Sequence, residues 1–311
     1  MKPIHVFLFI SGLLSLTGCS SLVQEVDPGK VPTATAKLVI HCYISPQDTV
    51  ITVVVEAPRA IIGLTDTSSA YRKTIANATV SLSDGSKTVR LLYSAKDLLY
   101  RISPGQLPIL TGKIYTLNVA APNYAPITAQ CTVPVAVAPA EVRVDTVRKP
   151  VTGRSGFYQL RLYARLFWQD PVGQPNYYQV TGYNISRSTS TLYNSQGKPI
   201  KDSVYTRTSQ LYFNKSNYLT DEGNDGVQLS SARGEVQNFY INPADKAGAL
   251  SIYLTLNTTD ALFYKYRDAV SRQADAGNNP FSEAVLIPSN IQNGLGCFAA
   301  FNQATLSVKV R

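Results

Sequence analysis

Cysteine is the residue type with the most distinct chemistry in this chain, because its thiol can act as a nucleophile or form a disulfide bond. Cys19 directly follows Leu16-Thr17-Gly18, at the end of an apolar run that begins at Ile4. Small residues before the cysteine suit a cleavage site, and the thiol could then take up a diacylglycerol. The spacing predicts lipid attachment at Cys19. An ordinary signal with an incidental cysteine is the alternative.

The segment 1–18 has the features of a secretory signal peptide. Lys2 gives it a positive start, and the apolar run after Lys2 is too short to span a bilayer. Together with Cys19, this segment resembles the lipobox of bacterial lipoproteins, so we expect export from the cytoplasm and a lipid anchor in a membrane. Residues 19–35 are polar and carry Pro28 and Gly29, and they are predicted to form a flexible lipidated tether.

Histidine and acidic residues are too few or too scattered for the common catalytic sites. The chain has 2 histidines, and removal of the signal peptide leaves His41 alone, so a two-histidine zinc site cannot form. His41 lies in the apolar stretch 38–44, where strand alternation places it on a sheet face and disfavours a catalytic triad. The 20 acidic residues include few close pairs. We therefore predict a non-enzyme with no cofactor.

One acidic loop, Asp221-Glu222-Gly223-Asn224-Asp225-Gly226, offers oxygens that could bind calcium. However, Gly223 occupies a ligand position, and Ala232 stands where an EF-hand needs its bidentate glutamate. The sequence therefore favours a solvated loop and predicts no metal site.

Two further cysteines fall in predicted strands with apolar neighbours. Alternation places Cys42 beside Ile40, and Cys131 beside Ala129 and Val133, so both should face a core. In an oxidising compartment they could form a disulfide bond, or they could be two separate buried thiols. Cys297 is predicted only to pack in an apolar stretch.

The composition describes a globular β-rich protein. Hydrophobic residues make up 44% and charged residues 16%, and tyrosine occurs 19 times. The formal net charge is +9, which suits a neighbourhood of anionic lipid or polysaccharide. Because the lysines and arginines are scattered along the chain, nucleic acid is not an expected partner.

Short strands alternate with turns across residues 36–134. Asp84-Gly85 between two apolar runs indicates a hairpin. The number and spacing of these strands predict an immunoglobulin-like β-sandwich. The Pro- and Val-rich stretch that follows predicts a linker over residues 135–156.

Residues 157–311 are predicted to form a second β-rich domain with one short helix, separable from the first. Its opening strand, Phe157 to Trp168, alternates apolar residues with polar ones such as Arg161 and Arg165. A helix is expected from Thr259, capped by Thr258 or Thr259, to about Ala274.

The C-terminal tail predicts a tight turn rather than a binding loop. Asn293-Gly294 and Gly296 suit positive φ, after which Phe298 and Phe301 would fill a core.

Several motifs together resemble one protein family, the domain-of-unknown-function 4249 lipoproteins of Bacteroidota. Besides the lipobox, these motifs are Lys37-Leu38-Val39-Ile40, Asp170-Pro171-x-Gly173, Asn176-Tyr177-Tyr178, Asn279-Pro280-Phe281-Ser282-Glu283 and Ser289-Asn290-Ile291-Gln292-Asn293-Gly294-Leu295-Gly296-Cys297-Phe298. The departures are small: Ala284 where proline is expected, and Cys297 where an aliphatic residue is usual. The resemblance covers nearly the whole mature chain.

The resemblance implies a lipid-anchored lipoprotein of the outer membrane, often encoded beside a TonB-dependent receptor. It implies no established chemistry and no catalytic residues. The expected function is therefore an accessory binding lipoprotein that works with such a receptor in nutrient capture, on either face of the outer membrane. A structural or assembly component of an outer-membrane complex is the alternative.

The resemblance also makes three hydroxyl residues candidates for O-glycosylation, because the phylum modifies sites of the form Asp, hydroxyl residue, aliphatic. These sites are Thr49 in Asp48-Thr49-Val50, Thr146 in Asp145-Thr146-Val147 and Ser203 in Asp202-Ser203-Val204. The same triplets are also natural entries from a turn into a strand. A bulky glycan requires that the hydroxyl faces water.

Overall fold

The computed structural model describes residues 37–58, 73–153, 158–213, 216–241, 249–276, 283 and 285–310. The predicted signal peptide and tether, with Cys19, lie outside these residues, as do residues 279–282 of the tail motif and Ala284. The prediction of a mainly β protein with one short helix is confirmed over the described residues, while the immunoglobulin-like detail stays a prediction. No described helix has both the length and the apolar character to cross a membrane.

The strands of the first half are short. They are β1 (Val39–Ile44), β2 (Ile51–Ala57), β3 (Lys73–Thr74), β4 (Thr79–Ser83), β5 (Thr88–Ser94), β6 (Leu99–Ile102), β7 (Ile114–Ala120) and β8 (Ile127–Thr132).

The second half contains several longer strands and the helix. Its elements are β9 (Pro139–Pro150), β10 (Tyr158–Gln169), β11 (Tyr177–Tyr193), β12 (Pro199–Gln210), β13 (Tyr212–Phe213), β14 (Tyr218–Thr220), β15 (Gln228–Ser230), β16 (Gly234–Ile241), β17 (Ala249–Thr259), α2 (Ala261–Ala276) and β18 (Leu295–Lys309).

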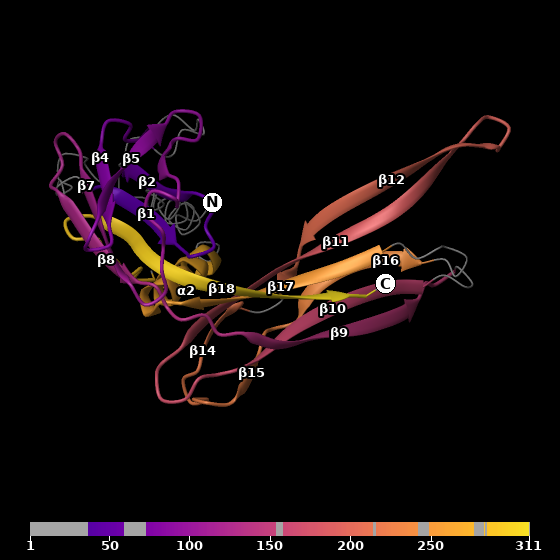
Figure 1. Cartoon of the computed structure of the whole chain (residues 1–311). Helices are drawn as coiled ribbons and strands as arrows, with labels where there is room; N and C mark the ends of the chain where they lie inside the picture. The colour runs from indigo at the N-terminus through magenta and orange to yellow at the C-terminus, as the bar shows by residue number, and fades with distance from the viewer. Residues whose placement is uncertain are drawn as a thin grey trace, which may run out of the picture. The chain divides into compact units, whose positions relative to one another are not determined.

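Hydrogen bonding joins these strands into two sheets. The larger follows the order β12-β11-β17-β18-β1-β2-β6-β5-β4-β7-β8, with β14 on β11 and β3 on β2. The smaller follows β13-β16-β10-β15, with β9 on the other side of β10. Figure 1 shows β9, β10 and β16 running alongside one another.

The first core follows from the alternation of buried and half-buried residues in β1 and in most of β2. Leu38, Ile40 and Ile44 are fully buried and pack with Val53 and Val55 of the neighbouring strand. The predicted hairpin is present: β4 and β5 pair antiparallel around a turn with Gly85 at φ 86°.

The second core lies between β10 and the strands β11 and β17. The apolar face predicted for β10 is confirmed, since Leu160, Leu162, Ala164, Leu166 and Trp168 are all buried. Burying this face removes a large apolar surface from water, which is the main source of its stability. The opposite face of β10 is half-buried and carries polar and aromatic side chains.

Strand β18 links the two cores. Its first residues pair parallel with β1, from Val39↔Leu295 to Ile44↔Ala300, and its later residues pair antiparallel with β17. Phe298 and Ala300 belong to the first core, whereas Leu306 and Val308 pack against the second. Figure 1 shows β18 as the yellow strand that runs beside β1 at its start and beside β17 further along.

This pairing differs from the predicted division into residues 36–134, a linker 135–156 and residues 157–311. The N-terminal core is completed by residues from the C-terminal end of the chain. A parallel pair between strands about 250 positions apart leaves no trace in local periodicity, which is why the shared strand escaped the prediction.

The predicted linker also contains a strand. Residues 139–150 form β9 and pair with β10 from Trp168↔Pro139 to Tyr158↔Pro150. Val142 and Val144 pack against the second core. The composition suggested an extended linker, but the alternation of valines with charged residues is that of an edge strand.

The tail turn agrees with its prediction in part: Gly294 does not have positive φ, and Phe301 is only half-buried. Asn293 has φ 61° and Gly296 φ 104°, and Phe298 is fully buried. A Cβ added at Gly296 would lie 2.0 Å from the Ile40 carbonyl oxygen, so the close approach of β18 to β1 requires glycine there.

The helix is also confirmed, with a different cap. β17 continues through Thr259, and Asp260 accepts the hydrogen bond from the Phe263 amide at 2.6 Å. Its second carboxylate oxygen accepts the Ala300 amide at 2.7 Å, so Asp260 caps α2 and fixes it to β18. Burial raises the pKa of Asp260.

Candidate functional site

Two connections in the second half lie side by side because of strand pairing. Asp170 begins the turn between β10 and β11, and Asp221 begins the loop after β14. β14 pairs with the start of β11 through Tyr177↔Thr220, which brings the turn against the loop. The Asp221 amide donates to the Asn176 carbonyl at 3.3 Å, and the Asp170 amide to the Val227 carbonyl at 3.1 Å.

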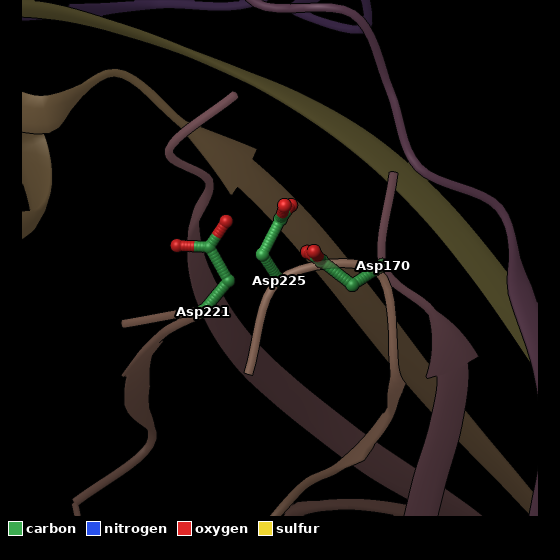
Figure 2. Close-up of side chains that lie close together, drawn as sticks. All are labelled: Asp170, Asp221 and Asp225. Atoms are coloured by element: carbon green, nitrogen blue, oxygen red, sulfur yellow. The ribbon is translucent and has the colours of Figure 1, made fainter. Parts of the chain in front are cut away.

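This arrangement gathers three aspartates. A carboxylate oxygen from each of Asp170, Asp221 and Asp225 lies within 4.8 Å of the others. Figure 2 shows the three side chains close together, with Asp170 from the turn and Asp221 and Asp225 from the loop. Asp170 and Asp221 are buried, whereas Asp225 is exposed.

Asp170 is held by two donors. The Tyr178 hydroxyl donates to its Oδ1 at 2.5 Å, and the Gly226 amide donates to its Oδ2 at 3.0 Å. Burial, followed by this hydrogen bond to Asp170, raises the pKa of Tyr178. Tyr178 also contacts Trp168 edge-on, with ring centroids 5.2 Å apart. Asp170 therefore joins the site to the second core.

The other two carboxylates hold the turn. Asp221 Oδ2 accepts the Asn176 amide at 2.9 Å, and Asp225 accepts the Gly173 amide at 2.9 Å on one oxygen and 3.1 Å on the other. Gly173 has φ 87°, a conformation that glycine adopts without strain.

No lysine or arginine in the described ranges forms an ion pair with these three aspartates. Carboxylates this close repel one another, and burial of two of them strengthens the repulsion. Oxygen ligands of this kind could hold a hard divalent cation. The three aspartates alone do not assign a metal.

A pocket of about 680 Å³ opens beside the cluster. Tyr177 and Tyr264 line it, with ring centroids 5.2 Å apart and planes at 39°. Asp221, Glu222 and Asp225 supply negative charge to the lining, and Lys265 is the cation in it. Aromatic faces and carboxylates together favour a small ligand that carries a positive group or several hydroxyl groups. We call this the Tyr177–Tyr264 pocket.

The parts of this site were recognisable in the sequence, but their proximity in space was not. The acidic loop supplied Asp221 and Asp225, and the Asp170-Pro171-x-Gly173 turn stood out as a family motif. The missing signal was the pairing of β11 with β14, which no local pattern carries. Tyr264 on α2 was also missed, because its helix-surface position reads as ordinary packing.

The three cysteines that the structure describes are separate from one another. Cys42 and Cys131 are free, buried thiols, so of the two alternatives it shows separate thiols. Burial raises the pKa of both thiols, and of Cys297 as well. Thiols kept neutral in this way are poor nucleophiles.

His41 lies on β1, as alternation predicted, and it is part of a packed contact. Its Nε2 lies 2.8 Å from the Tyr266 hydroxyl of α2. The ring centroids of the two residues are 6.0 Å apart. This contact helps to hold α2 against the sheet.

The glycosylation candidates differ in exposure. Thr49 precedes β2 and is exposed, Thr146 lies on β9 and is exposed, and Ser203 lies on β12 and is half-buried. Glycosylation of at least one of them stays a prediction. The exposure that a glycan needs is met best at Thr49 and Thr146.

Comparison with known proteins places the chain in a family. A search of curated proteins finds no match. The family model described as "Domain of unknown function (DUF4249)" matches residues 24–307. This range contains all the described strands apart from the last two residues of β18. The chain therefore belongs to the DUF4249 family.

Proposed function

We propose that this protein is a lipid-anchored accessory lipoprotein of the outer membrane that binds a ligand together with a TonB-dependent receptor in nutrient capture. The observation that carries the anchoring is Cys19, placed directly after Leu16-Thr17-Gly18 at the end of a short apolar segment. The receptor partnership is what the family resemblance implies. Membership of DUF4249 supports that resemblance over residues 24–307.

The Tyr177–Tyr264 pocket supports a binding role. Its volume of about 680 Å³ lies in the range of sites for small organic ligands. We assign no catalytic residue: in this pocket the Thr220 hydroxyl donates to Asp221 Oδ1 at 3.5 Å, which is long for a base that activates a nucleophile.

A structural or assembly component of an outer-membrane complex is the second candidate. One observation favours it: the hairpin of β11 and β12 exposes apolar side chains at Leu192, Ile200, Val204 and Tyr205. Exposed apolar groups on an edge hairpin suit contact with another protein.

A cysteine substitution tests the anchor. Cys19→Ala should leave the protein without lipid, so that it is recovered in the soluble envelope fraction without detergent. Ser21→Ala, a neighbouring change that keeps the thiol, should remain in the membrane fraction. Firm membrane attachment of Cys19→Ala would show that something other than Cys19 holds the protein.

A further inference from the structure

The outer face of the smaller sheet gathers arginines around aromatic rings. β10 turns its apolar side chains into the second core, so Arg161, Tyr163, Arg165 and Phe167 lie on the opposite, half-buried face. β9 adds Arg143, whose Cα is the partner of Arg165. Arg233 contacts Tyr163 on the same face. We call these six residues the arginine face.

Aromatic rings hold two of these guanidinium groups in place. The Arg143 guanidinium lies 4.1 Å from the centroid of Phe167, and that of Arg233 lies 4.9 Å from the centroid of Tyr163. Stacking of this kind limits side-chain motion, so less freedom is lost when a ligand binds.

The positive charge of the face is only partly neutralised. Arg143 pairs with Glu141 at 2.8 Å, and Arg233 pairs with Asp145 at 2.9 Å. Arg161 and Arg165 have no carboxylate partner among the described residues, and the buried Nε of each has no hydrogen-bond partner there.

The pairing of Arg165 opposite Arg143 adds a repulsive contact. Like charges directly opposite on neighbouring antiparallel strands are destabilising. An anionic group lying over the face would relieve this repulsion, and Arg161 would extend the same contact along β10. Three carboxylates accompany the four arginines, namely Glu141, Asp145 and Glu235, the last being the Cα partner of Tyr163. The face therefore keeps a net positive charge toward a negatively charged partner.

We propose that the arginine face binds the phosphate groups of an anionic lipid bilayer. A planar guanidinium matches the oxygens of a phosphate, and aromatic rings beside arginines suit the boundary between water and lipid. The choice of a bilayer rests on the proposed anchor, because the 17 residues from 19 to 35 can extend at most about 60 Å from the membrane. Attraction to phosphate headgroups does not depend on that anchor.

Vesicle binding by the mature chain with Cys19→Ala, which carries no lipid, separates this proposal from the anchor. Sedimentation should show binding to phosphatidylcholine vesicles that contain about one third phosphatidylglycerol, weak binding to phosphatidylcholine alone, and loss of binding at high salt. Each arginine near an anionic surface contributes roughly fivefold, so Arg161→Gln with Arg165→Gln should weaken binding about 25-fold.

A matched variant controls for net charge. Arg90→Gln with Lys96→Gln removes the same charge from β5 and the turn after it, and should keep binding within about twofold. Equal loss in both double variants would mean that only the overall charge matters and would overturn the proposal. The proposal would also be overturned if the protein with an unsubstituted arginine face did not bind anionic vesicles.

A second measurement needs no substitution on the face. Anionic vesicles should protect Arg161 and Arg165 from an arginine-specific reagent, while vesicles of phosphatidylcholine alone should not. Equal modification with both vesicles would overturn the proposal. A third outcome would also overturn the proposal. If the Arg161→Gln, Arg165→Gln variant kept its vesicle binding but lost a protein that co-purifies with the unsubstituted chain, the face would bind a protein and not a bilayer.

Discussion

Two acidic turns in this protein use aspartate in opposite ways. In the hairpin between β4 and β5, Asp84 accepts the Lys87 amide at 2.8 Å and the Lys113 ammonium at 3.0 Å. Those hydrogen bonds hold the pKa of Asp84 well below its usual range. In the cluster of Asp170, Asp221 and Asp225, backbone amides also donate, but no described lysine or arginine pairs with the carboxylates.

The difference separates a structural turn from a candidate binding site. The charge of Asp84 is balanced within the protein, and its hydrogen bonds are those of a local turn. The cluster holds three like charges, two of them buried, beside a pocket with two tyrosines. Lys265 lines the pocket but forms no ion pair with the three aspartates among the described residues, so a positively charged ligand would balance their charge.

The largest expected difference between the two turns is the loss of stability when an aspartate that accepts hydrogen bonds is removed. Asp170→Ala leaves the buried Tyr178 hydroxyl and the Gly226 amide without their acceptor, and should lower the free energy of unfolding by about 3 kcal/mol. Urea unfolding measures this loss. Asp84→Ala should lose less, because the freed amides of its exposed turn can bind water.

Asp170→Asn serves as the conservative control. It keeps an acceptor for Tyr178 but offers an NH₂ group toward Gly226, so its loss should fall between wild type and Asp170→Ala. Equal losses for Asp170→Ala and Asp84→Ala would remove the distinction between the two turns.

A smaller contrast concerns charge alone. Asp225→Asn removes one of three mutually repelling carboxylates and keeps an acceptor for Gly173, so stability should stay within about 0.5 kcal/mol or rise. Asp84→Asn loses its ion pair with Lys113 and should be destabilised. Thermal unfolding of both variants in the same buffer compares the signs. A clear loss for Asp225→Asn would mean that its charge is already balanced.

The smallest contrast is in pH dependence, between Asp84 and Asp48. The lowered pKa of Asp84 gives a stabilising contribution that is present above its usual pKa near 4 and is lost as the pH falls below it. Burial raises the pKa of Asp48 to about 6, so its folded state binds the proton more tightly. Its effect has the opposite sign: stability falls as the pH rises from about 4 to 6.

Two variants separate these effects. Asp84→Asn should flatten the loss of thermal stability on the acid side, and Asp48→Asn should flatten the fall between about pH 4 and 6. The same profile for both variants would mean that neither carboxylate has the environment described here.

The two turns also show what local sequence can reveal. The hairpin at Asp84 was predictable, because Asp-Gly between apolar runs specifies a turn by local conformational preference. The faces of β1 and β10 were predictable from alternation. The aspartate cluster was not, since Asp170 and Asp221 meet only through the pairing of β11 with β14. The same limit hid β18, whose parallel partner lies at the other end of the chain.

Purification of the native complex tests the central proposal most directly. The protein, tagged after its C-terminal strand, would be extracted from the membrane fraction with mild detergent and its partners identified by mass spectrometry. We expect a TonB-dependent receptor among the partners, and acylation of the N-terminal peptide that begins at Cys19. Recovery of the protein alone, or only with outer-membrane assembly proteins, would contradict the proposed role in nutrient capture.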